Sequence, residues 1–160
     1  MGALLGLVVA GCSSSSPSPP ADFSGDYSVA ITNGQNGCNF KNWTVGSSSN
    51  GTPVAITQNG SSVNADVGGV AGAYYQAILG SHVFTGGVSG TRMSAVIHGT
   101  QSFPQGNCTY QVTANLGASI SGDSISGTVD YTTTTNGGSD CGTLVGCSST
   151  QSFAGSRPPK

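Results

Sequence analysis

The chain has 160 residues, 6% of them charged against ~25% in a usual soluble protein, and a formal net charge of −2 at pH 7. Its polar surface must therefore come mainly from Ser, Thr, Gly, Asn and Gln rather than from ions. The four Lys and Arg residues are scattered along the sequence, which excludes the basic patch that a nucleic-acid partner needs.

The first twelve residues have the pattern of an export signal. Residues 2–11 form an apolar stretch that fits a signal peptide and is much shorter than the roughly 20 residues of a membrane-spanning helix. The stretch ends in Val9-Ala10-Gly11-Cys12. This tetrad resembles the lipobox of bacterial lipoproteins, in which small residues precede a lipidated cysteine. The resemblance implies that residues 1–11 are removed and that Cys12 carries diacylglycerol.

A run of Ser and Pro follows Cys12 over residues 13–20. This composition cannot bury a core and its prolines keep it extended, so residues 12–22 are expected to tether a folded domain to a membrane. The lipoprotein resemblance adds that a chain with Ser after the cysteine is sorted to the outer membrane where the organism has one. The expected location is the bacterial cell envelope.

From Tyr27 onward, apolar and polar residues alternate with a period of two, which is typical of half-buried strands, and no window keeps a helical spacing. Turn-forming pairs such as Asn59-Gly60 separate the runs by too few residues for parallel crossovers, so the strands must pair antiparallel. The expected strands are residues 26–32, 53–58, 61–68, 82–88, 91–98, 108–120, 124–133 and 149–155.

A short motif recurs, a large apolar residue followed two positions later by glycine: Phe23-x-Gly25, Phe84-x-Gly86, Ile125-x-Gly127 and Phe153-x-Gly155. Inward glycines permit the sharp coiling that curls a sheet into a barrel. Residues 23–157 are therefore expected to form one all-β domain, an antiparallel up-and-down β-barrel of about eight strands closed by its first and last strands. The alternative is an open β-sandwich, and residues 158–160 form a tail.

Three residues give this barrel a family resemblance. Gly25 lies two residues before the aromatic Tyr27 in the first strand, and Arg157 follows the last strand. The arrangement resembles that of lipocalin and avidin-like barrels, although Tyr27 stands where lipocalins have tryptophan. The resemblance implies that Arg157 covers the floor of the barrel.

The chain has five cysteines. Once Cys12 is assigned to the lipid, Cys38, Cys108, Cys141 and Cys147 remain as an even set, which predicts two disulfides in an oxidising compartment. Of the three possible pairings we favour Cys141–Cys147, whose intervening glycines let the chain turn back, together with Cys38–Cys108. The spacing lacks the CxxC pairs and nearby histidines of zinc sites, so no metal site is predicted.

The sequence shows no frame for catalysis or for a cofactor. His82 and His98 are the only histidines, and neither lies in a recognised nucleophile–base motif. The six aspartates fall in turns or alternate outward, without the pairing that glycoside hydrolysis needs or the spacing of a calcium loop. We therefore expect a non-enzymatic protein without a cofactor.

Two segments interrupt the strand pattern. Residues 68–80 are apolar but neither alternate cleanly nor show helical spacing. They fit either a bent strand or covering turn that plugs one end of the barrel, or a mouth-lining loop that presents Tyr74 and Tyr75 to a ligand. Residues 39–43 offer Trp43 as a further candidate, with a disulfide-pinned loop folded on the core as the alternative.

Two hypotheses for function follow. In the first, the barrel interior holds a small apolar or amphipathic ligand, which requires a cavity. In the second, the barrel has a solid core and serves a structural or surface-interaction role as a lipoprotein.

Overall fold

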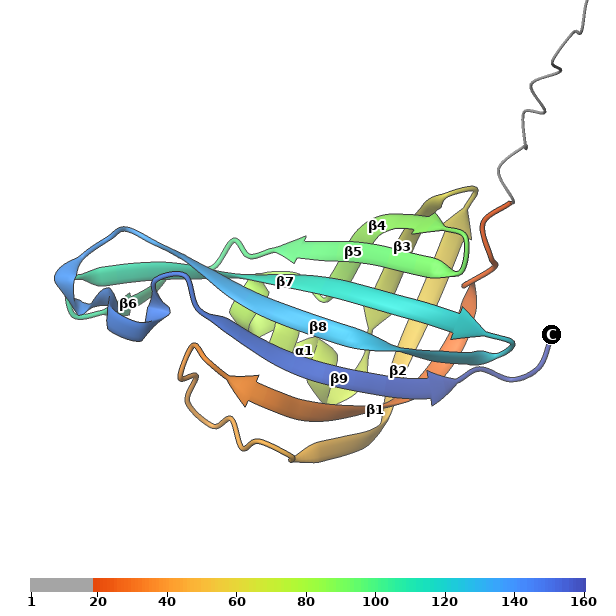
Figure 1. Ribbon diagram of the computed structural model, residues 1–160, viewed down its shortest axis with the longest axis horizontal. Helices are drawn as coiled ribbons and strands as arrows, with labels where there is room; N and C mark the ends of the chain where they lie inside the picture. The colour runs from red at the N-terminus through yellow and green to blue at the C-terminus, as the bar shows by residue number, and fades with distance from the viewer. Residues whose placement is uncertain (1–18) are drawn as a thin grey trace, which may run out of the picture.

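Alternation of apolar and polar residues produces nine strands in the computed structural model, which describes residues 19–160. Eight of them pair antiparallel in chain order, and the first pairs with the last to close a barrel (Figure 1). The ninth, β6, adds an edge beside β7. The strands are β1 (Gly25–Asn36), β2 (Ser48–Asn59), β3 (Ser62–Val67), β4 (Val83–Ser89), β5 (Arg92–His98), β6 (Phe103–Gln105), β7 (Cys108–Ser121), β8 (Ser124–Thr135) and β9 (Ser148–Ser156).

The closed barrel confirms the up-and-down fold and the eight expected strands. β5 pairs with β7, so the short β6 is bypassed and the barrel wall is continuous. The expected leader and Cys12 lie outside the described residues. The core, both disulfides and the barrel floor all lie within residues 19–160, which therefore make a self-sufficient folding unit.

Three of the recurring glycines, Gly86, Gly127 and Gly155, lie where the backbone of a neighbouring strand leaves no room for a Cβ. A Cβ on Gly127 would collide with the backbone oxygen of Gly117, and one on Gly155 would collide with that of Ser28. Only glycine allows this approach, which lets the long strands coil tightly enough to close the barrel.

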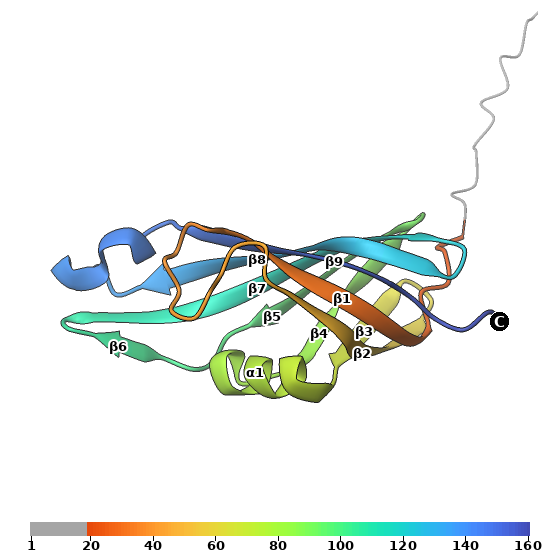
Figure 2. The same ribbon diagram turned by 90° about the horizontal axis from the view of Figure 1, so that it is seen from below.

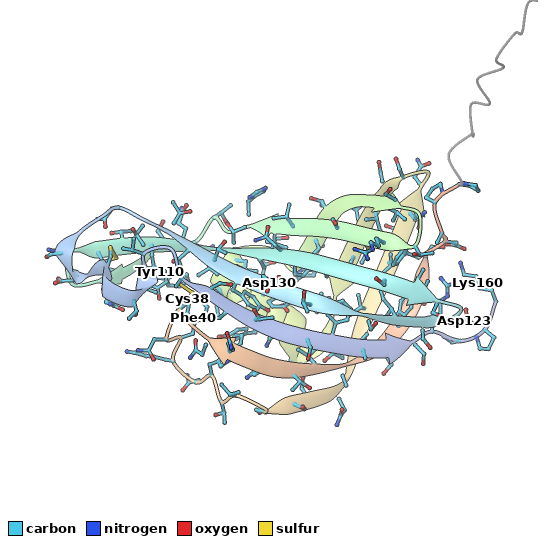
Figure 3. All side chains as sticks on the ribbon, viewed as in Figure 1. Cys38, Phe40, Tyr110, Asp123, Asp130 and Lys160 are labelled. Atoms are coloured by element: carbon cyan, nitrogen blue, oxygen red, sulfur yellow. A yellow bond between two sulfur atoms is a disulfide. The ribbon has the colours of Figure 1, made fainter. Side chains whose placement is uncertain are left out.

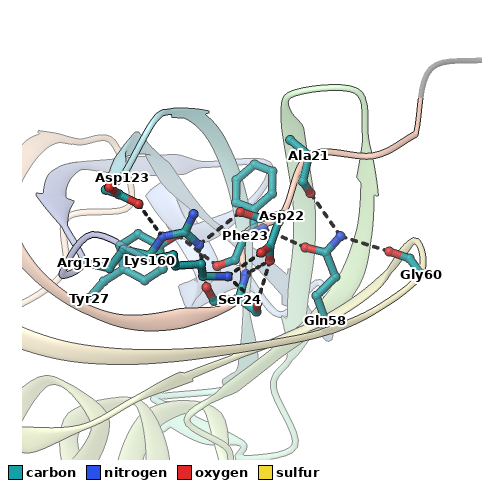
Figure 4. Close-up of polar contacts among 10 residues, drawn as sticks. All are labelled: Ala21, Asp22, Phe23, Ser24, Tyr27, Gln58, Gly60, Asp123, Arg157 and Lys160. Carbon is teal, nitrogen blue, oxygen red and sulfur yellow. Dashed lines mark hydrogen bonds and ion pairs between the residues drawn. The ribbon is translucent and has the colours of Figure 1, made fainter.

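Arg157 lies across the floor of the barrel (Figure 4). Its side chain is only 7% exposed; Nε donates to Asp123 Oδ1 at 3.1 Å and Nη1 donates to the carbonyl of Asp22 at 3.0 Å. The guanidinium carbon lies 5.6 Å from the centre of the Tyr27 ring, a cation–π distance. Gly25, at φ +141°, leaves room for it, since a Cβ there would lie 2.9 Å from Arg157 Cδ.

The N-terminal segment packs under the same floor. Phe23 is fully buried, and its carbonyl accepts the Tyr27 hydroxyl at 3.0 Å. Gln58 accepts the Phe23 amide proton and donates to the carbonyl of Ala21, which fixes the entering chain against the end of β2 (Figure 4). In the tail, Lys160 pairs with Asp22, and this hydrogen-bonded pair lowers the pKa of the Asp22 carboxyl below its usual range.

Residues 68–80 correct the sequence prediction, because they contain the helix α1 (Gly69–Leu79) rather than an irregular segment. The helix buries Gly72, Tyr75 and Leu79, a helical spacing, but Val70 and Tyr74 on its outer side are also apolar and hide the pattern. Gly80 ends the helix at φ +80°, as a C-terminal glycine commonly does.

The helix α1 lies at the end of the barrel opposite the floor. The turn between β2 and β3 lies at the floor, beside Gln58, so β3 runs from the floor to the other end. The helix connects the end of β3 to the start of β4, and it therefore lies at this other end of the barrel (Figure 2). This end is called the mouth below.

Two disulfides form, as expected, but the favoured pairing is wrong: Cys38 bonds Cys147, and Cys108 bonds Cys141. A 3₁₀ segment, η1 (Ser139–Leu144), separates Cys141 from Cys147. It sends Cys141 towards the start of β7 and Cys147 towards the loop after β1. In both observed pairs the Cα atoms are 4.9 Å apart, within the range that a disulfide spans.

The two disulfides should contribute unequally to stability. The Cys38–Cys147 bond joins residues 109 apart, and its double replacement by alanine should lower the free energy of unfolding by about 4–5 kcal/mol, because long loops cost more closure entropy. The Cys108–Cys141 bond joins residues 33 apart, and its replacement should cost about 3–4 kcal/mol. Urea denaturation of both variants measures the difference, and non-reducing peptide mapping checks the pairing. A Cys141–Cys147 peptide would contradict it.

Candidate ligand site at the barrel mouth

Within residues 19–160, two spaces of very different size lie one above the other along the barrel. Between the floor and Tyr75, the barrel interior is filled by apolar side chains such as Phe84, Met93 and Val129, and its open space is about 30 Å³, room for one water molecule. At the mouth lies a cavity of about 810 Å³. That volume falls in the range of small-molecule sites.

Four segments that are distant in sequence form the cavity wall. They are the loop between β1 and β2, the helix α1, the β6–β7 hairpin and η1. Figure 3 shows Cys38, Phe40 and Tyr110 gathered near the mouth end, with Asp123 and Lys160 at the floor end. The lining residues are Asn33, Cys38, Asn39, Phe40, Lys41, Asn42, Trp43, Tyr74, Tyr75, Ile78, Leu79, Phe103, Pro104, Gln105, Tyr110, Val112, Tyr131, Thr143, Leu144 and Gln151.

The loop between β1 and β2 is held by backbone and side-chain contacts. The Asn36 amide group brackets Phe40, donating to its carbonyl at 3.0 Å and accepting its N–H at 2.8 Å. The Cys38 disulfide ties the start of the loop to the segment before β9. Asn39 and Asn42 take φ values of 55° and 61°, which Asn tolerates better than most residues. The loop is thus held in place before any ligand arrives.

Trp43 forms the inner wall of this loop. Its indole Nε1 donates to the Gly34 carbonyl at 3.0 Å, and its ring meets the Tyr131 ring edge-on, with centres 5.7 Å apart. The Phe40 ring also packs against Trp43, with ring centres 6.2 Å apart. The loop thus combines the two arrangements considered from the sequence. A disulfide fixes it against the core, and Trp43 also lines the cavity.

A chain of hydrogen bonds forms the bottom of the mouth cavity, at the end opposite the barrel floor. Tyr131 donates to Gln151 Oε1 at 2.5 Å, and Gln151 Nε2 donates to Asn33 Oδ1 at 2.7 Å. The hydroxyl oxygens of Tyr75 and Tyr131 lie 2.7 Å apart, and because Tyr131 has already used its proton, Tyr75 is the donor. Tyr75 also packs edge-on against Phe84 below, at 5.7 Å. This chain separates the dry interior from the mouth.

Burial controls the ionisation of these hydroxyls. Desolvation raises the pKa of Tyr75, and it raises the pKa of Tyr131 well above its ordinary value, with a further increase from the neighbouring Tyr75. Both side chains are therefore neutral at physiological pH and act as hydrogen-bonding groups rather than charges.

The three residues expected at a mouth all line this cavity. Tyr75 is buried at the bottom of the cavity, Tyr74 is 54% exposed at its rim, and Trp43 forms its inner wall. The sequence analysis missed Gln151 and Asn33. A signal existed, because both are polar residues at inward positions of the alternation, two beyond Ser149 and Ile31 respectively.

The two histidines do not line this cavity. His82 Nε2 is 3.3 Å from Asp66 Oδ1 and its Nδ1 is 3.1 Å from Gln76 Oε1, at the junction of α1 and β4. His98 is exposed at the end of β5. Across residues 19–160, no cluster of three or more His, Cys, Asp or Glu is placed to hold a metal ion. No helix in that same part of the chain is long and apolar enough to cross a bilayer.

Comparison with known proteins gave no match, whether to a family model, to a curated protein or to a solved structure.

Ionisation of the two buried tyrosines should make the fold sensitive to high pH. Their pKa values are raised in the folded protein, so their stabilising contribution is complete below the unfolded pKa of about 10 and is lost as pH rises through the folded values. Urea midpoints should fall steeply above about pH 10. The Tyr75→Phe/Tyr131→Phe variant should show a shallower fall than the wild type. An equally steep fall in the variant would assign the alkaline sensitivity to other groups.

Proposed function

We propose that this protein is a lipid-anchored, exported protein of the bacterial cell envelope that binds a small amphipathic ligand, without catalysis, in the cavity at the mouth of its barrel. The single observation that carries the proposal is the cavity of about 810 Å³, seven of whose twenty lining residues are aromatic. Concave, mostly apolar sites with a few placed polar groups are typical of small-molecule binding.

The ligand is placed at the mouth rather than inside the barrel. About 30 Å³ of free interior cannot hold an organic molecule, whereas the mouth cavity can. We infer that the Tyr75–Tyr131–Gln151 chain is the lower limit of the site, because these hydrogen-bonded side chains separate the cavity from the filled interior. Trp43, Tyr74 and Phe103 would contact the apolar part.

The kinship with lipocalin and avidin-like barrels is also a proposal. It is supported by the eight-stranded meander and by Arg157 lying beside Gly25 and over Tyr27 at the floor. A shared architecture does not specify a ligand, since one fold carries many functions.

The place where the chain enters the barrel fits an anchor at Cys12. Residues 21–23 reach the barrel at its floor, where the Ala21 N–H donates to the Gly90 carbonyl at 2.8 Å. The mouth lies at the opposite end (Figure 1). A lipid on Cys12 would therefore attach the protein by its closed end and leave the mouth accessible.

A structural or surface-interaction lipoprotein without a ligand is the alternative. The filled barrel interior favours it, because such a barrel needs nothing bound to be stable. The two proposals differ in one measurable property, which is saturable binding at the mouth.

Binding at the mouth can be read from Trp43, the only tryptophan of the chain. N-phenyl-1-naphthylamine, a neutral dye that brightens in dry surroundings, should bind residues 19–160 at one site and accept energy from Trp43. Tyr74→Ser should weaken this binding about five-fold, because one aromatic contact is lost from the wall. Fluorescence titration gives both dissociation constants.

Val70→Ser is the matched control. Val70 is 90% exposed on the same helix and does not line the cavity, so the dye affinity should not change. Absence of saturable energy transfer from Trp43 in the wild type would reject the ligand proposal in favour of the structural alternative.

Anchoring predicts a change of cell fraction. In a bacterial host that processes lipoproteins, the wild-type chain should be labelled by radioactive palmitate and should sediment with membranes. Cys12→Ser should abolish the label, because no other cysteine follows the lipobox pattern. Cys12→Ser protein that keeps the palmitate label would contradict the assignment of Cys12.

A further inference from the structure

Lys41 is the one formally charged residue among those that line the mouth cavity. The other lining residues are apolar, aromatic or neutral polar, and among them are no Asp, Glu or His. The chain has only four Lys and Arg residues, and one of them therefore lies at the proposed site.

Lys41 is also unneutralised within residues 19–160. Of the other basic residues, Arg157 pairs with Asp123 and Lys160 pairs with Asp22, both at the floor. No carboxylate in the described part of the chain lies within ion-pair distance of Lys41. The loop that carries it is held at both sides, by the Cys38 disulfide and by the Trp43–Gly34 hydrogen bond. The loop backbone that carries Lys41 is thus fixed, while its exposed side chain has no carboxylate partner within residues 19–160.

Aromatic residues line the same cavity as Lys41. Phe40 and Trp43 flank it in the same loop, and Phe103 and Tyr110, with ring centres 5.6 Å apart, belong to the β6–β7 hairpin. Aromatic faces favour flat apolar groups through offset and edge-on contacts. The cavity thus joins one cationic group to several flat apolar surfaces.

We propose that the ligand is an anionic amphiphile with a flat apolar body, its negative group held by Lys41 and its body between the aromatic walls. This inference rests on the proposed function, because it names the ligand class of the same cavity. Lys41 would then set specificity by charge, while the aromatic walls supply most of the affinity.

Two dyes that share one apolar body test the charge. 8-Anilinonaphthalene-1-sulfonate carries a sulfonate, and N-phenyl-1-naphthylamine is its neutral counterpart. Residues 19–160 should bind the anionic dye more tightly, with energy transfer from Trp43 for both. Lys41→Gln should weaken the anionic dye about three- to five-fold, the size expected of one partly exposed charge pair, and leave the neutral dye unchanged. Raising the salt concentration should weaken the anionic dye in the wild type and not in Lys41→Gln.

Matched variants complete the design. Lys41→Arg should keep the preference for the anion, because it keeps the charge. Arg92→Gln removes a positive charge from β5, away from the cavity lining, and should change neither affinity. Equal affinity for the two dyes, unchanged in Lys41→Gln, overturns the anion inference and leaves the mouth site intact. Failure of both dyes to accept energy from Trp43 overturns the proposed function itself.

Discussion

The pairing of β1 with β9 joins the two ends of the chain into one wall, and the rest of the structure depends on it. Each of the eight barrel strands then has two neighbours, so the wall exposes no unpaired edge. The pairing register also decides which side chains face inward, since a shift of one residue would turn every apolar side chain outward. A chain with few charges can hold a single register because its inward face is so consistently apolar.

The two ends of this barrel are closed by different means. At the floor, one buried cation, Arg157, meets a carboxylate and backbone carbonyls, and Phe23 fills the space beneath it. At the mouth, strands β7 and β8 project beyond the barrel and have little core of their own. Two disulfides fasten the projecting segments there instead. The two ends of the barrel therefore differ: the floor is closed by side chains, whereas the mouth is open and is held by two disulfides.

The sequence predicted the strands well because a period of two survives whatever the strand packs against. It failed at residues 69–79, where the helix is apolar on both its buried and its exposed sides and so leaves no amphipathic pattern. It also failed at the cysteine pairing. Sequence proximity favoured Cys141–Cys147, whereas η1 sends the two cysteines to different partners.

The sequence by itself determined the strands and the presence of two disulfides, and it favoured a closed barrel over an open sandwich, because these follow from local alternation, glycine positions and residue type. It offered Tyr74, Tyr75 and Trp43 as mouth residues without deciding between that role and packing on the core. Only the tertiary structure decided that the barrel interior is full, that the space lies above Tyr75, and that Lys41 and Gln151 share it. These two residues are 110 positions apart along the chain. Cavity volume depends on how side chains from distant strands fill a common space, and a local sequence pattern does not predict it.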